Sequence, residues 1–381
     1  MLIGIGGKSN TGKTTFFSAA TLIQAEISNR IFTTIKPNRG IGWVQKPCPC
    51  QKLGVKCEPR NSKCIQGIRH IPVQLLDVAG LVPGAHEGRG LGNQFLDELM
   101  DSDVIIHVID LSGGTDQDGN PVQPGTRDPQ EDIRAFELEL DYWLLSLLER
   151  GWDQVEKQVR HQGKRLEAVL AERFSGLKIS REAVKQAIEK TGFGLEGDKM
   201  EFVRELRRIA KPILVAGNKA DLPQAKKNLK PGIIPVSAEA ELTLRKAADA
   251  GFISYLPGSK DFEILKPLSP EQERALEYIR ENVLKPFGST GVQECLNKAV
   301  FDLLGYRVVY PVANLGKLSD KEGRILPDAF LVKPGTRLKE FAYQIHTELG
   351  ERFLGGIGLD RKRLSADYEL QDGDIIEILV R

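Results

Sequence analysis

A glycine-rich loop directly after an apolar N-terminal run constrains this chain more than any other feature. The segment Gly7-Lys8-Ser9-Asn10-Thr11-Gly12-Lys13-Thr14 fits the pattern G-x-x-x-x-G-K-[ST]. It follows a predicted buried strand, Leu2–Gly6, and opens a predicted helix, Thr14–Ile27, which is the context in which this pattern forms a phosphate-binding loop, or P-loop. The glycines let backbone N–H groups surround phosphate oxygens, Lys13 supplies a positive charge, and the Thr14 hydroxyl can bind Mg²⁺.

Three further short motifs each follow a predicted strand. Asp77-Val78-Ala79-Gly80 places a carboxylate where it can reach Mg²⁺ through water, and Gly80 where it can follow the γ-phosphate. In Asn218-Lys219-Ala220-Asp221, the Asp221 carboxylate can accept hydrogen bonds from the N1–H and 2-amino groups of guanine, which adenine does not present. Ser237-Ala238 follows the next strand, where a backbone N–H can meet the guanine O6. The order of the motifs predicts a guanine-nucleotide site.

The residues expected to contact the nucleotide come from these motifs. Thr33 and Thr34 lie between the P-loop and Asp77, where a mobile loop could offer one hydroxyl to Mg²⁺. The predicted nucleotide-contacting residues are Gly7, Lys8, Ser9, Asn10, Thr11, Gly12, Lys13, Thr14, Thr15, Asn218, Lys219, Asp221, Ser237 and Ala238.

Short Val- and Ile-rich runs recur through the first two thirds of the chain. The runs are Val73–Asp77, Val104–Asp110, Ile213–Ala216 and Ile233–Val236. Helical segments separate them, which predicts a parallel sheet covered by helices on both faces, a three-layer α/β domain. We assign residues 1–130 and 211–300 to this domain, with a cysteine-rich basic insertion at 36–70.

Two segments depart from this alternation of strands and helices. Residues 131–210 carry apolar residues at helical spacing, which predicts a helical insertion. Either it is a supporting hairpin, which is the interpretation we favour because an apolar stripe usually packs internally, or it is an arm that docks a partner. Residues 305–381 contain three predicted strands around one amphipathic helix, Leu338–Leu349, which predicts a small α+β module able to fold alone.

The set of motifs resembles the translation-factor-type P-loop GTPases and, more narrowly, the archaeal-type members of the Obg family. Phe32-Thr33-Thr34 matches the switch I pattern of that family, and the run DVAGLVPGAHEGRGLGN at 77–93 resembles switch II of its YchF/Obg-like ATPase branch. The segments 326–328, 333–336 and 370–374 resemble the TGS domain, a β-grasp fold. The resemblance covers nearly the whole chain, and it favours Thr34 over Thr33 as the Mg²⁺ ligand.

One departure from the branch concerns base recognition. YchF proteins usually carry an altered motif and favour ATP, whereas Asn218, Lys219 and Asp221 here keep the intact GTPase pattern. We therefore expect a GTP-binding and GTP-hydrolysing switch with Mg²⁺ as cofactor, and the resemblance implies the ribosome or ribosomal RNA as its partner. Two alternatives are a nucleotide-gated protein-binding scaffold with incidental turnover, and an ATPase like other members of the branch.

Hydrolysis is expected to be slow without help. Leu81 occupies the position at which Ras-like enzymes use a glutamine to orient the attacking water. Asn10 stands where potassium-activated relatives hold K⁺, and a cation there would offset charge that develops between the β- and γ-phosphates; the alternative is a loop-capping asparagine. His86 and Arg89 in switch II could approach the γ-phosphate. The predicted catalytic residues are Lys13, Asn10, Gly80 and His86.

Four cysteines fall within 17 residues: Cys48, Cys50, Cys57 and Cys64. Four thiolates can form a tetrahedral zinc site, although the spacing is not the usual paired C-x-x-C, so disulfides and free thiols remain alternatives. The stretch 36–69 also contains eight Lys and Arg residues and one acid, Glu58. A basic loop beside switch I could bind RNA phosphates.

The overall charge narrows the classes of partner. Lys and Arg total 53 against 52 Asp and Glu, a net charge of +1, which does not indicate a globally basic nucleic-acid binder. From Gly305 onward, twelve basic residues face twelve acidic ones, so charge alone does not indicate RNA binding there. The apolar runs are too short to span a bilayer, and the N-terminus lacks the features of a signal peptide, so we expect a cytoplasmic protein with no membrane partner.

Overall fold

The computed structural model describes residues 1–21, 39–78, 80, 84 and 92–381, and it divides the chain into two compact units. Within the described residues, the first unit comprises 1–21, 39–40, 74–78, 80, 84 and 92–295, and the second comprises 41–73 and 296–381. Residues 41–73, which the sequence pattern groups with the α/β domain, thus pack with the C-terminal segment. In the described part of the chain, no helix has the length and apolar character needed to cross a bilayer.

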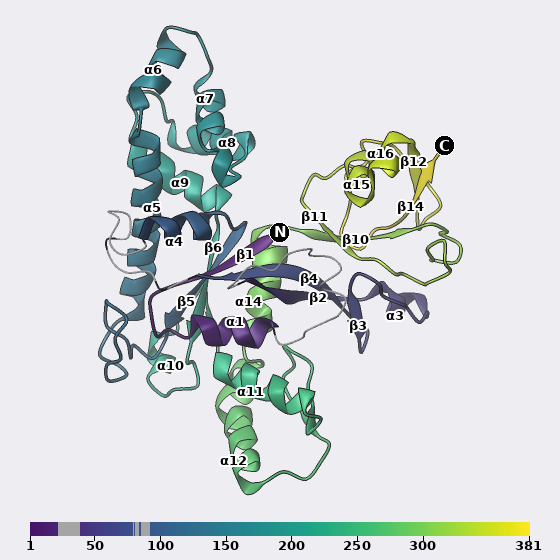
Figure 1. Ribbon diagram of the computed structural model, residues 1–381. Helices are drawn as coiled ribbons and strands as arrows, with labels where there is room; N and C mark the ends of the chain where they lie inside the picture. The colour runs from purple at the N-terminus through teal and green to yellow at the C-terminus, as the bar shows by residue number, and fades with distance from the viewer. Residues whose placement is uncertain (22–38, 79, 81–83, 85–91) are drawn as a thin grey trace. The chain divides into compact units, whose positions relative to one another are not determined.

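The first unit is built on parallel strands (Figure 1). Strand β1 lies between β4 and β5, and β5, β6 and β7 follow in that order, all in parallel register. Strand β5, VIIHVID, is buried along its whole length, as expected for a strand with helices on both faces. The strands are β1 (Leu2–Gly6), β4 (Ile68–Asp77), β5 (Val104–Asp110), β6 (Ile213–Asn218) and β7 (Ile233–Pro235).

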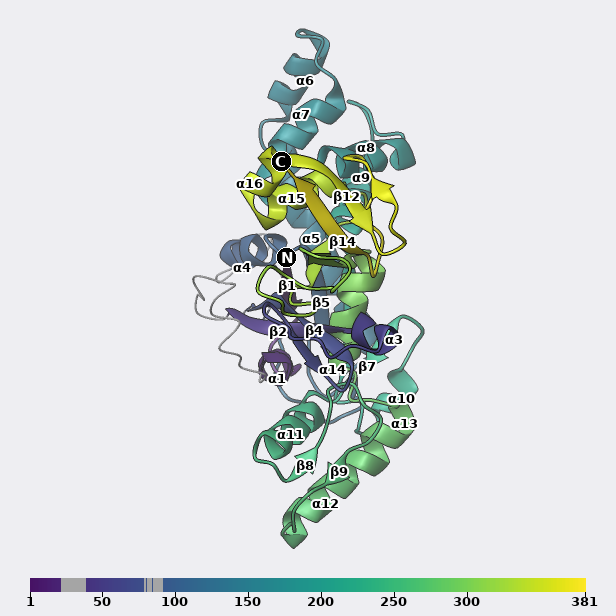
Figure 2. The ribbon, with the colours of Figure 1, turned by 90° about the vertical axis from the view of Figure 1, so that its right-hand side faces the viewer.

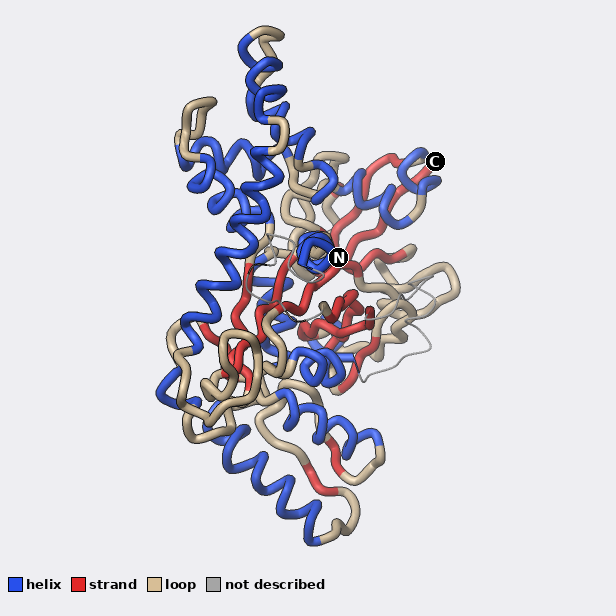
Figure 3. Tube along the Cα trace, turned by 60° about the vertical axis from the view of Figure 1, so that its left-hand side comes forward, coloured by secondary structure: helices blue, strands red, loops and turns tan. Residues whose placement is uncertain are grey.

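Helices surround these strands (Figure 3). The helices α4 and α5 share one buried core with Leu2, Leu76 and Ile105 of the sheet, while α1 packs against β1 and α11. This arrangement confirms the predicted three-layer α/β fold. The helices and short strands that complete the sheet layers are α1 (Lys13–Thr21), α4 (Gly92–Met100), α5 (Pro129–Glu149), α10 (Ala225–Asn228), α11 (Ala238–Asp249), β8 (Ile253–Ser254), β9 (Glu263–Ile264), α12 (Pro270–Ile279), a π-helical turn η3 (Arg280–Leu284), α13 (Lys285–Phe287) and α14 (Val292–Asn297).

The helical insertion extends from the far end of α5 (Figure 1). Its apolar stripe is buried internally, with Leu144, Trp143 and Phe202 in one core. Helix α9 is joined to α5 by a buried ion pair, Arg207 Nε to Asp141 Oδ1 at 2.6 Å. The remaining helices are α6 (Trp152–Arg160), α7 (Leu166–Arg173), a 3₁₀ turn η2 (Ser175–Leu177), α8 (Arg181–Thr191) and α9 (Lys199–Ala210).

The second unit contains the cysteine-rich segment and a small mixed sheet in the order β11-β10-β14-β12-β13 (Figure 2). Strands β10 and β14 are parallel and the other neighbours antiparallel. Phe341 of α15 packs with Val309 and Ile376 of the sheet, as in a β-grasp fold. The elements are β2 (Arg39–Pro47), α3 (Pro49–Leu53), β3 (Lys63–Ile65), a π-helical turn η4 (Lys298–Leu303), β10 (Arg307–Val312), β11 (Phe330–Val332), α15 (Leu338–Ile345), α16 (Thr347–Glu351), β12 (Phe353–Gly358), β13 (Arg363–Leu364) and β14 (Ile375–Val380).

The predicted helix Leu338–Leu349 is wrong in one respect. The chain leaves the helical conformation at His346, whose φ of −163° ends α15. The His346 Nδ1 atom then accepts a hydrogen bond from the Glu348 N–H and caps α16. Local side-chain capping thus divides one predicted helix into two.

Candidate nucleotide-binding site

The P-loop runs from the end of β1 into α1. The Lys13 ammonium group donates to the Lys8 carbonyl oxygen at 2.7 Å, and the Thr11 hydroxyl donates to the same oxygen at 3.1 Å. Burial lowers the pKa of Lys13 to about 8, and the charge of Asp77 opposes that shift. A buried ammonium group that donates to a carbonyl oxygen gains a stronger partner when a phosphate anion enters the loop.

The two described residues predicted to bind Mg²⁺ are adjacent. Thr14 Oγ1 donates to Asp77 Oδ2 at 3.0 Å. Burial raises the pKa of Asp77, while the Thr14 hydrogen bond and Lys13 lower it. A hydroxyl and a carboxylate supply the hard oxygen donors that Mg²⁺ prefers, so the residues present fit this ion. Thr34 lies outside the described residues.

Asn218 connects three of the predicted motifs. Its side-chain Nδ2 donates to the Thr11 carbonyl at 2.8 Å, and its Oδ1 accepts from the Ala238 N–H at 3.0 Å. The residue is buried, so these bonds satisfy backbone groups that water does not reach. Gly12, at φ +93°, allows this approach because a Cβ there would lie 2.1 Å from Asn218 Nδ2. The phosphate loop and the predicted base-binding segments are thereby fixed to each other.

The predicted base-recognition carboxylate has two hydroxyl partners. Asp221 Oδ1 accepts from Ser237 Oγ at 2.9 Å, and Oδ2 accepts from the Tyr278 hydroxyl at 3.3 Å. A carboxylate offers about four acceptor sites, so these bonds leave capacity for the two guanine donors. Lys219 has a left-handed backbone conformation, and its ammonium group binds the buried Asp110 carboxylate at 2.7 Å. Tyr278 belongs to α12 and was not predicted from the sequence.

A tight turn at 116–120 lies against the P-loop. Asn10 Nδ2 donates to the Gly119 carbonyl at 2.8 Å. A Cβ added at Gly119 would lie 2.9 Å from Ser9 Cβ, so only glycine fits this contact. Asp116 closes the turn by accepting from the Asn120 N–H at 2.8 Å. The turn residues Asp-Gln-Asp-Gly-Asn are a recognisable local signal, but their contact with the P-loop depends on the fold.

The beginning of the predicted switch II also reaches the P-loop. A Cβ at Gly80 would lie 2.4 Å from Ser9 Oγ, so Gly80 passes close to the loop. Further on, the Gly84 N–H donates to Glu139 Oε1 of α5 at 2.7 Å. Other predicted switch residues, namely Thr33, Leu81, His86 and Arg89, lie outside the described residues.

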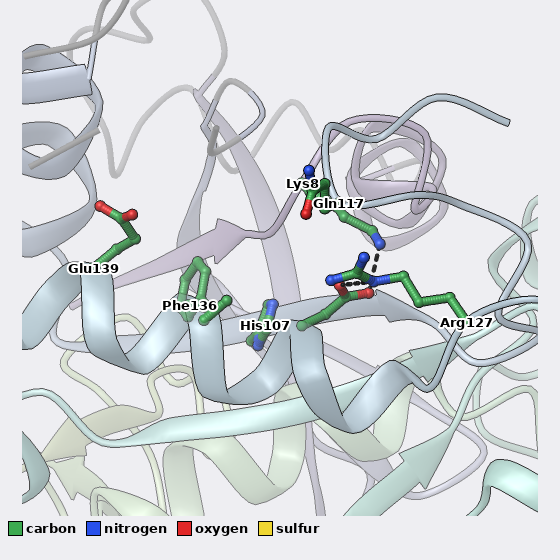
Figure 4. Close-up of a pocket in the computed structure, with 8 residues that line it drawn as sticks. Lys8, His107, Gln117, Arg127, Phe136 and Glu139 are labelled. Carbon is green, nitrogen blue, oxygen red and sulfur yellow. Dashed lines mark hydrogen bonds and ion pairs between the residues drawn. The ribbon is translucent and has the colours of Figure 1, made fainter. Parts of the chain in front are cut away.

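The Lys8 side chain is bound to α5 through its ammonium group. Lys8 Nζ pairs with Asp132 Oδ2 at 2.6 Å, and Arg127 Nε lies 3.3 Å from Asp132 Oδ1. These groups line a cavity of about 200 Å³ with His107, Gln117, Phe136 and Glu139 (Figure 4). The Lys8 carbonyl oxygen thus faces Lys13 and Thr11 in the P-loop, whereas its ammonium group faces Asp132.

His107 forms the apolar side of this cavity. Its ring stacks on Phe136 at a centroid distance of 3.9 Å. Burial lowers the pKa of His107 to about 3, with further lowering by Lys13 and Lys8, so the ring is neutral at physiological pH. Sequence analysis missed His107, Asp132 and Glu139, because their spacing in the chain carries no motif.

The four predicted metal-ligating cysteines lie together. Their Sγ atoms are all within 4.8 Å of one another, and no disulfide joins any of the described cysteines. Cys295 is buried in α14.

The surrounding basic segment is largely paired with acids or buried. Arg39 faces Asp101, Lys46 Nζ lies 2.8 Å from Asp372 Oδ2, and Arg60 pairs with Asp328. Arg69 is fully buried. Lys52, Lys56 and Arg60 are exposed among the described basic residues of this segment.

Three known families match successive parts of the chain. Residues 2–148 match the family described as 50S ribosome-binding GTPase, and residues 216–314 match the Obg-like GTPase YGR210-like, G4 motif-containing domain. Residues 322–380 match the TGS domain, as the motifs at 326–328, 333–336 and 370–374 predict.

Whole proteins of similar sequence span the same length. A GTP-binding protein of Methanocaldococcus jannaschii is 49% identical, over 99% of this chain and 98% of the relative. The ribosome-binding ATPase YchF of Bacillus subtilis is 28% identical, over 98% and 97%. The crystal structure of a GTP-binding protein from Pyrococcus horikoshii is 38% identical and superposes with a TM-score of 0.79, with both chains fully covered.

Proposed function

Since the chain belongs to the Obg-like family of P-loop GTP-binding proteins, which includes the YchF branch, we propose that it is a guanine-specific, Mg²⁺-dependent GTP hydrolase that works as a molecular switch. The observation that carries this proposal is the Asn218 side chain, which binds the P-loop at Thr11 and the Ser237–Ala238 segment at Ala238. This connection sets the distance between the phosphate site and Asp221, so that one nucleotide can reach both.

The phosphate groups would be held by the P-loop backbone and Lys13. Lys13 would exchange the Lys8 carbonyl for phosphate oxygens, whose negative charge reduces the cost of burying its ammonium group. Thr14 and Asp77 would hold Mg²⁺, which when bound neutralises negative charge on the phosphate oxygens. Gly80, close to Ser9, is placed to follow the γ-phosphate and to signal its loss to the following segment.

The Gly84–Glu139 hydrogen bond supports a route by which this signal reaches α5. Gly84 lies seven residues after Asp77, within the segment that resembles switch II, and Glu139 lies on the helix that carries the insertion. Reorganisation of the segment on hydrolysis would break or remake this bond. The proposed switch therefore couples nucleotide state to the helical insertion.

Slow intrinsic turnover and stimulation by K⁺ are part of the proposal. Leu81 has no hydrogen-bonding group with which to orient water. The carbonyl oxygen of the Asn10 side chain would bind K⁺, while its nitrogen is held by Gly119. The Gly119 bond also suits the alternative role of Asn10 as a loop-holding residue. Equal GTP turnover in KCl and NaCl would leave only that second role.

Ribosome association is proposed from relatives called ribosome-binding and from the 50S ribosome-binding GTPase match. It is tested by co-sedimentation with ribosomes in GDP and in a non-hydrolysable GTP analogue, at fixed salt because phosphate contacts weaken steeply as salt rises. Retention only with the analogue supports a ribosome-associated switch in the cytoplasm. Stable GTP-dependent protein partners without ribosome stimulation would favour the scaffold alternative.

Base specificity tests the proposal most directly. We expect GTP to displace a bound fluorescent GDP analogue at far lower concentration than ATP. Asp221→Asn replaces an acceptor with a donor, so it should lower GTP affinity about 100-fold or more and raise XTP affinity, since xanthine presents a carbonyl in place of the 2-amino group. Equal competition by ATP and GTP in the wild-type protein would favour the ATPase alternative instead.

A further inference from the structure

Four thiols meet in the second unit although they come from separate short elements. Cys48 precedes α3, Cys50 lies in its first turn, Cys57 lies in the following loop, and Cys64 lies in β3. We propose that they bind one Zn²⁺ ion as a structural tetrathiolate site, and that this ion holds the loop 57–64 in the conformation that docks the β-grasp module. The proposal stands independently of the nucleotide site.

The sulfur spacing fits a tetrahedral ion. Cys48 Sγ lies 3.9 Å from Cys57 Sγ, and Cys50 Sγ lies 3.9 Å from Cys64 Sγ. Zinc–sulfur bonds of about 2.3 Å at the corners of a tetrahedron place neighbouring sulfurs about 3.8 Å apart. A disulfide would instead bring one pair of sulfurs to about 2.05 Å. With four protein ligands and two of them buried, the site is closed and suits a structural ion.

A buried positive charge accompanies the cluster. Arg69 is the antiparallel strand partner of Cys64 in the β3–β4 hairpin. Its guanidinium group is fully buried and donates to Ser62 Oγ at 2.9 Å and to the Leu326 carbonyl at 2.8 Å. Zn²⁺ with four thiolates carries a net charge of −2, which a buried guanidinium partly offsets. The same guanidinium joins the cluster to the β-grasp module.

The loop between the third and fourth cysteines makes the main connection to that module. The Glu58 N–H donates to the Ile325 carbonyl at 2.8 Å, and the Arg60 N–H donates to the Pro327 carbonyl at 2.7 Å. These alternate bonds resemble a short piece of sheet, although neither segment is a strand. Arg60 Nε also donates to Asp328 Oδ1 at 3.1 Å.

Asn61 completes the connection in both directions. Its Nδ2 donates to the Ala329 carbonyl at 3.1 Å, and its Oδ1 accepts from the Ala329 N–H at 2.9 Å. The loop has little regular structure of its own and is too short to build a core. Fixing Cys57 and Cys64 on one ion fixes both ends of the docking loop.

The first measurement is metal content. Protein purified without chelator is expected to contain one zinc per chain by mass spectrometry of the elements. Replacement with Co²⁺ is expected to give the visible absorption of tetrahedral cobalt thiolate. Cys57→Ser and Cys64→Ser should lose both signals, whereas the control Cys295→Ser, at a buried cysteine outside the cluster, should keep them. Absence of zinc and of the cobalt spectrum, or disulfides in mass spectra of the non-reduced protein, would overturn the site.

The second measurement is amide hydrogen exchange in the full chain. Removal of the metal by chelation is expected to speed exchange at the Glu58, Arg60 and Ala329 amides at least about tenfold, and restored zinc should reverse it. Chelation of wild-type protein avoids dependence on variants that fail to fold. If zinc binds but its removal leaves these amides protected, the docking role is overturned. GTP affinity, measured in parallel, reports separately on the nucleotide site.

Discussion

The nucleotide site and the cysteine cluster are assembled in opposite ways. The nucleotide site draws on residues 200 positions apart, yet parallel strands bring them together, and Asn218 joins the P-loop to the base-binding segment without a ligand. The cysteine cluster draws on 17 residues, but the elements around it, α3 and β3, are only five and three residues long. A sheet can preorganise distant groups, whereas on our proposal an ion holds the residues of the short local elements in place.

Because the sheet preorganises the nucleotide site, we expect nucleotide affinity to depend on individual charged side chains. Lys13→Ala removes the ammonium group that a phosphate would neutralise. Loss of a buried charge partner costs about 2–5 kcal/mol, so GTP affinity should fall by roughly 30-fold to several thousand-fold in titration calorimetry with Mg²⁺. The exposed Lys178→Ala serves as a matched control and should bind normally. A change below about threefold would mean that Lys13 is not the principal phosphate ligand.

The Asn218→Ala variant tests whether Asn218 holds the P-loop and the base-binding segment together. The change leaves the Thr11 carbonyl and the Ala238 N–H without their buried partner, and each such group costs about 1–3 kcal/mol. The free energy of unfolding of the nucleotide-free protein should therefore fall by about 2–6 kcal/mol in urea. Asn228→Ala, which removes a single bond to the Leu111 carbonyl, is the matched control and should cost about 1 kcal/mol. Equal losses in the two variants would contradict the proposed bridging role of Asn218.

Features set by a local sequence pattern could be predicted from the sequence, whereas contacts between distant segments could not. The run VIIHVID at Val104–Asp110 was predicted with its observed ends, because an apolar β-branched run between turn residues has few other conformations. The motif residues Asn218 and Asp221 were predicted as base-site residues because chemistry fixes their type and order. Their contact with the base stays a prediction.

Long-range partners could not be predicted in this way. The Lys8–Asp132 pair and the Glu139–Gly84 bond depend on how α5 lies beneath the P-loop. The sequence likewise shows the positive charges of the cysteine segment without the acidic residues that pair with some of them. Asp328, 268 residues away, neutralises Arg60. Electrostatic conclusions from sequence are therefore weakest where a loop packs against a distant domain.

A smaller effect is expected in the pH dependence of GTP affinity, and its direction follows from the pKa of Lys13. With its pKa near 8, Lys13 in the nucleotide-free protein loses its proton between pH 7 and 9, and phosphate would restore it. GTP affinity should therefore fall roughly tenfold over this range, with proton uptake on binding visible as a buffer-dependent heat. Because the unfolded lysine keeps its proton to higher pH, this group makes the nucleotide-free fold more stable as pH rises from about 8 toward 10.5.

The control for this pH dependence is Lys13→Arg, whose guanidinium stays charged throughout. Its remaining pH dependence reports the titration of the guanine N1–H alone. A wild-type slope no steeper than that of the Lys13→Arg variant would show that Lys13 does not lose its proton in this range.

The smallest effect is expected for a substitution of Tyr278. It distinguishes a residue that positions Asp221 from one that contacts the base directly. Tyr278→Phe removes one hydrogen bond of 3.3 Å on a half-exposed side chain. Such a bond contributes about 0.5 kcal/mol, so GTP affinity should fall about two- to threefold, with discrimination against ATP falling in step because Asp221 is less well held. If Tyr278 instead flanks the base through its ring, the phenylalanine variant will match the wild type and only Tyr278→Ala will weaken binding. Reduced affinity for GTP and ATP alike would exclude a role through Asp221, since that carboxylate recognises guanine groups that adenine lacks.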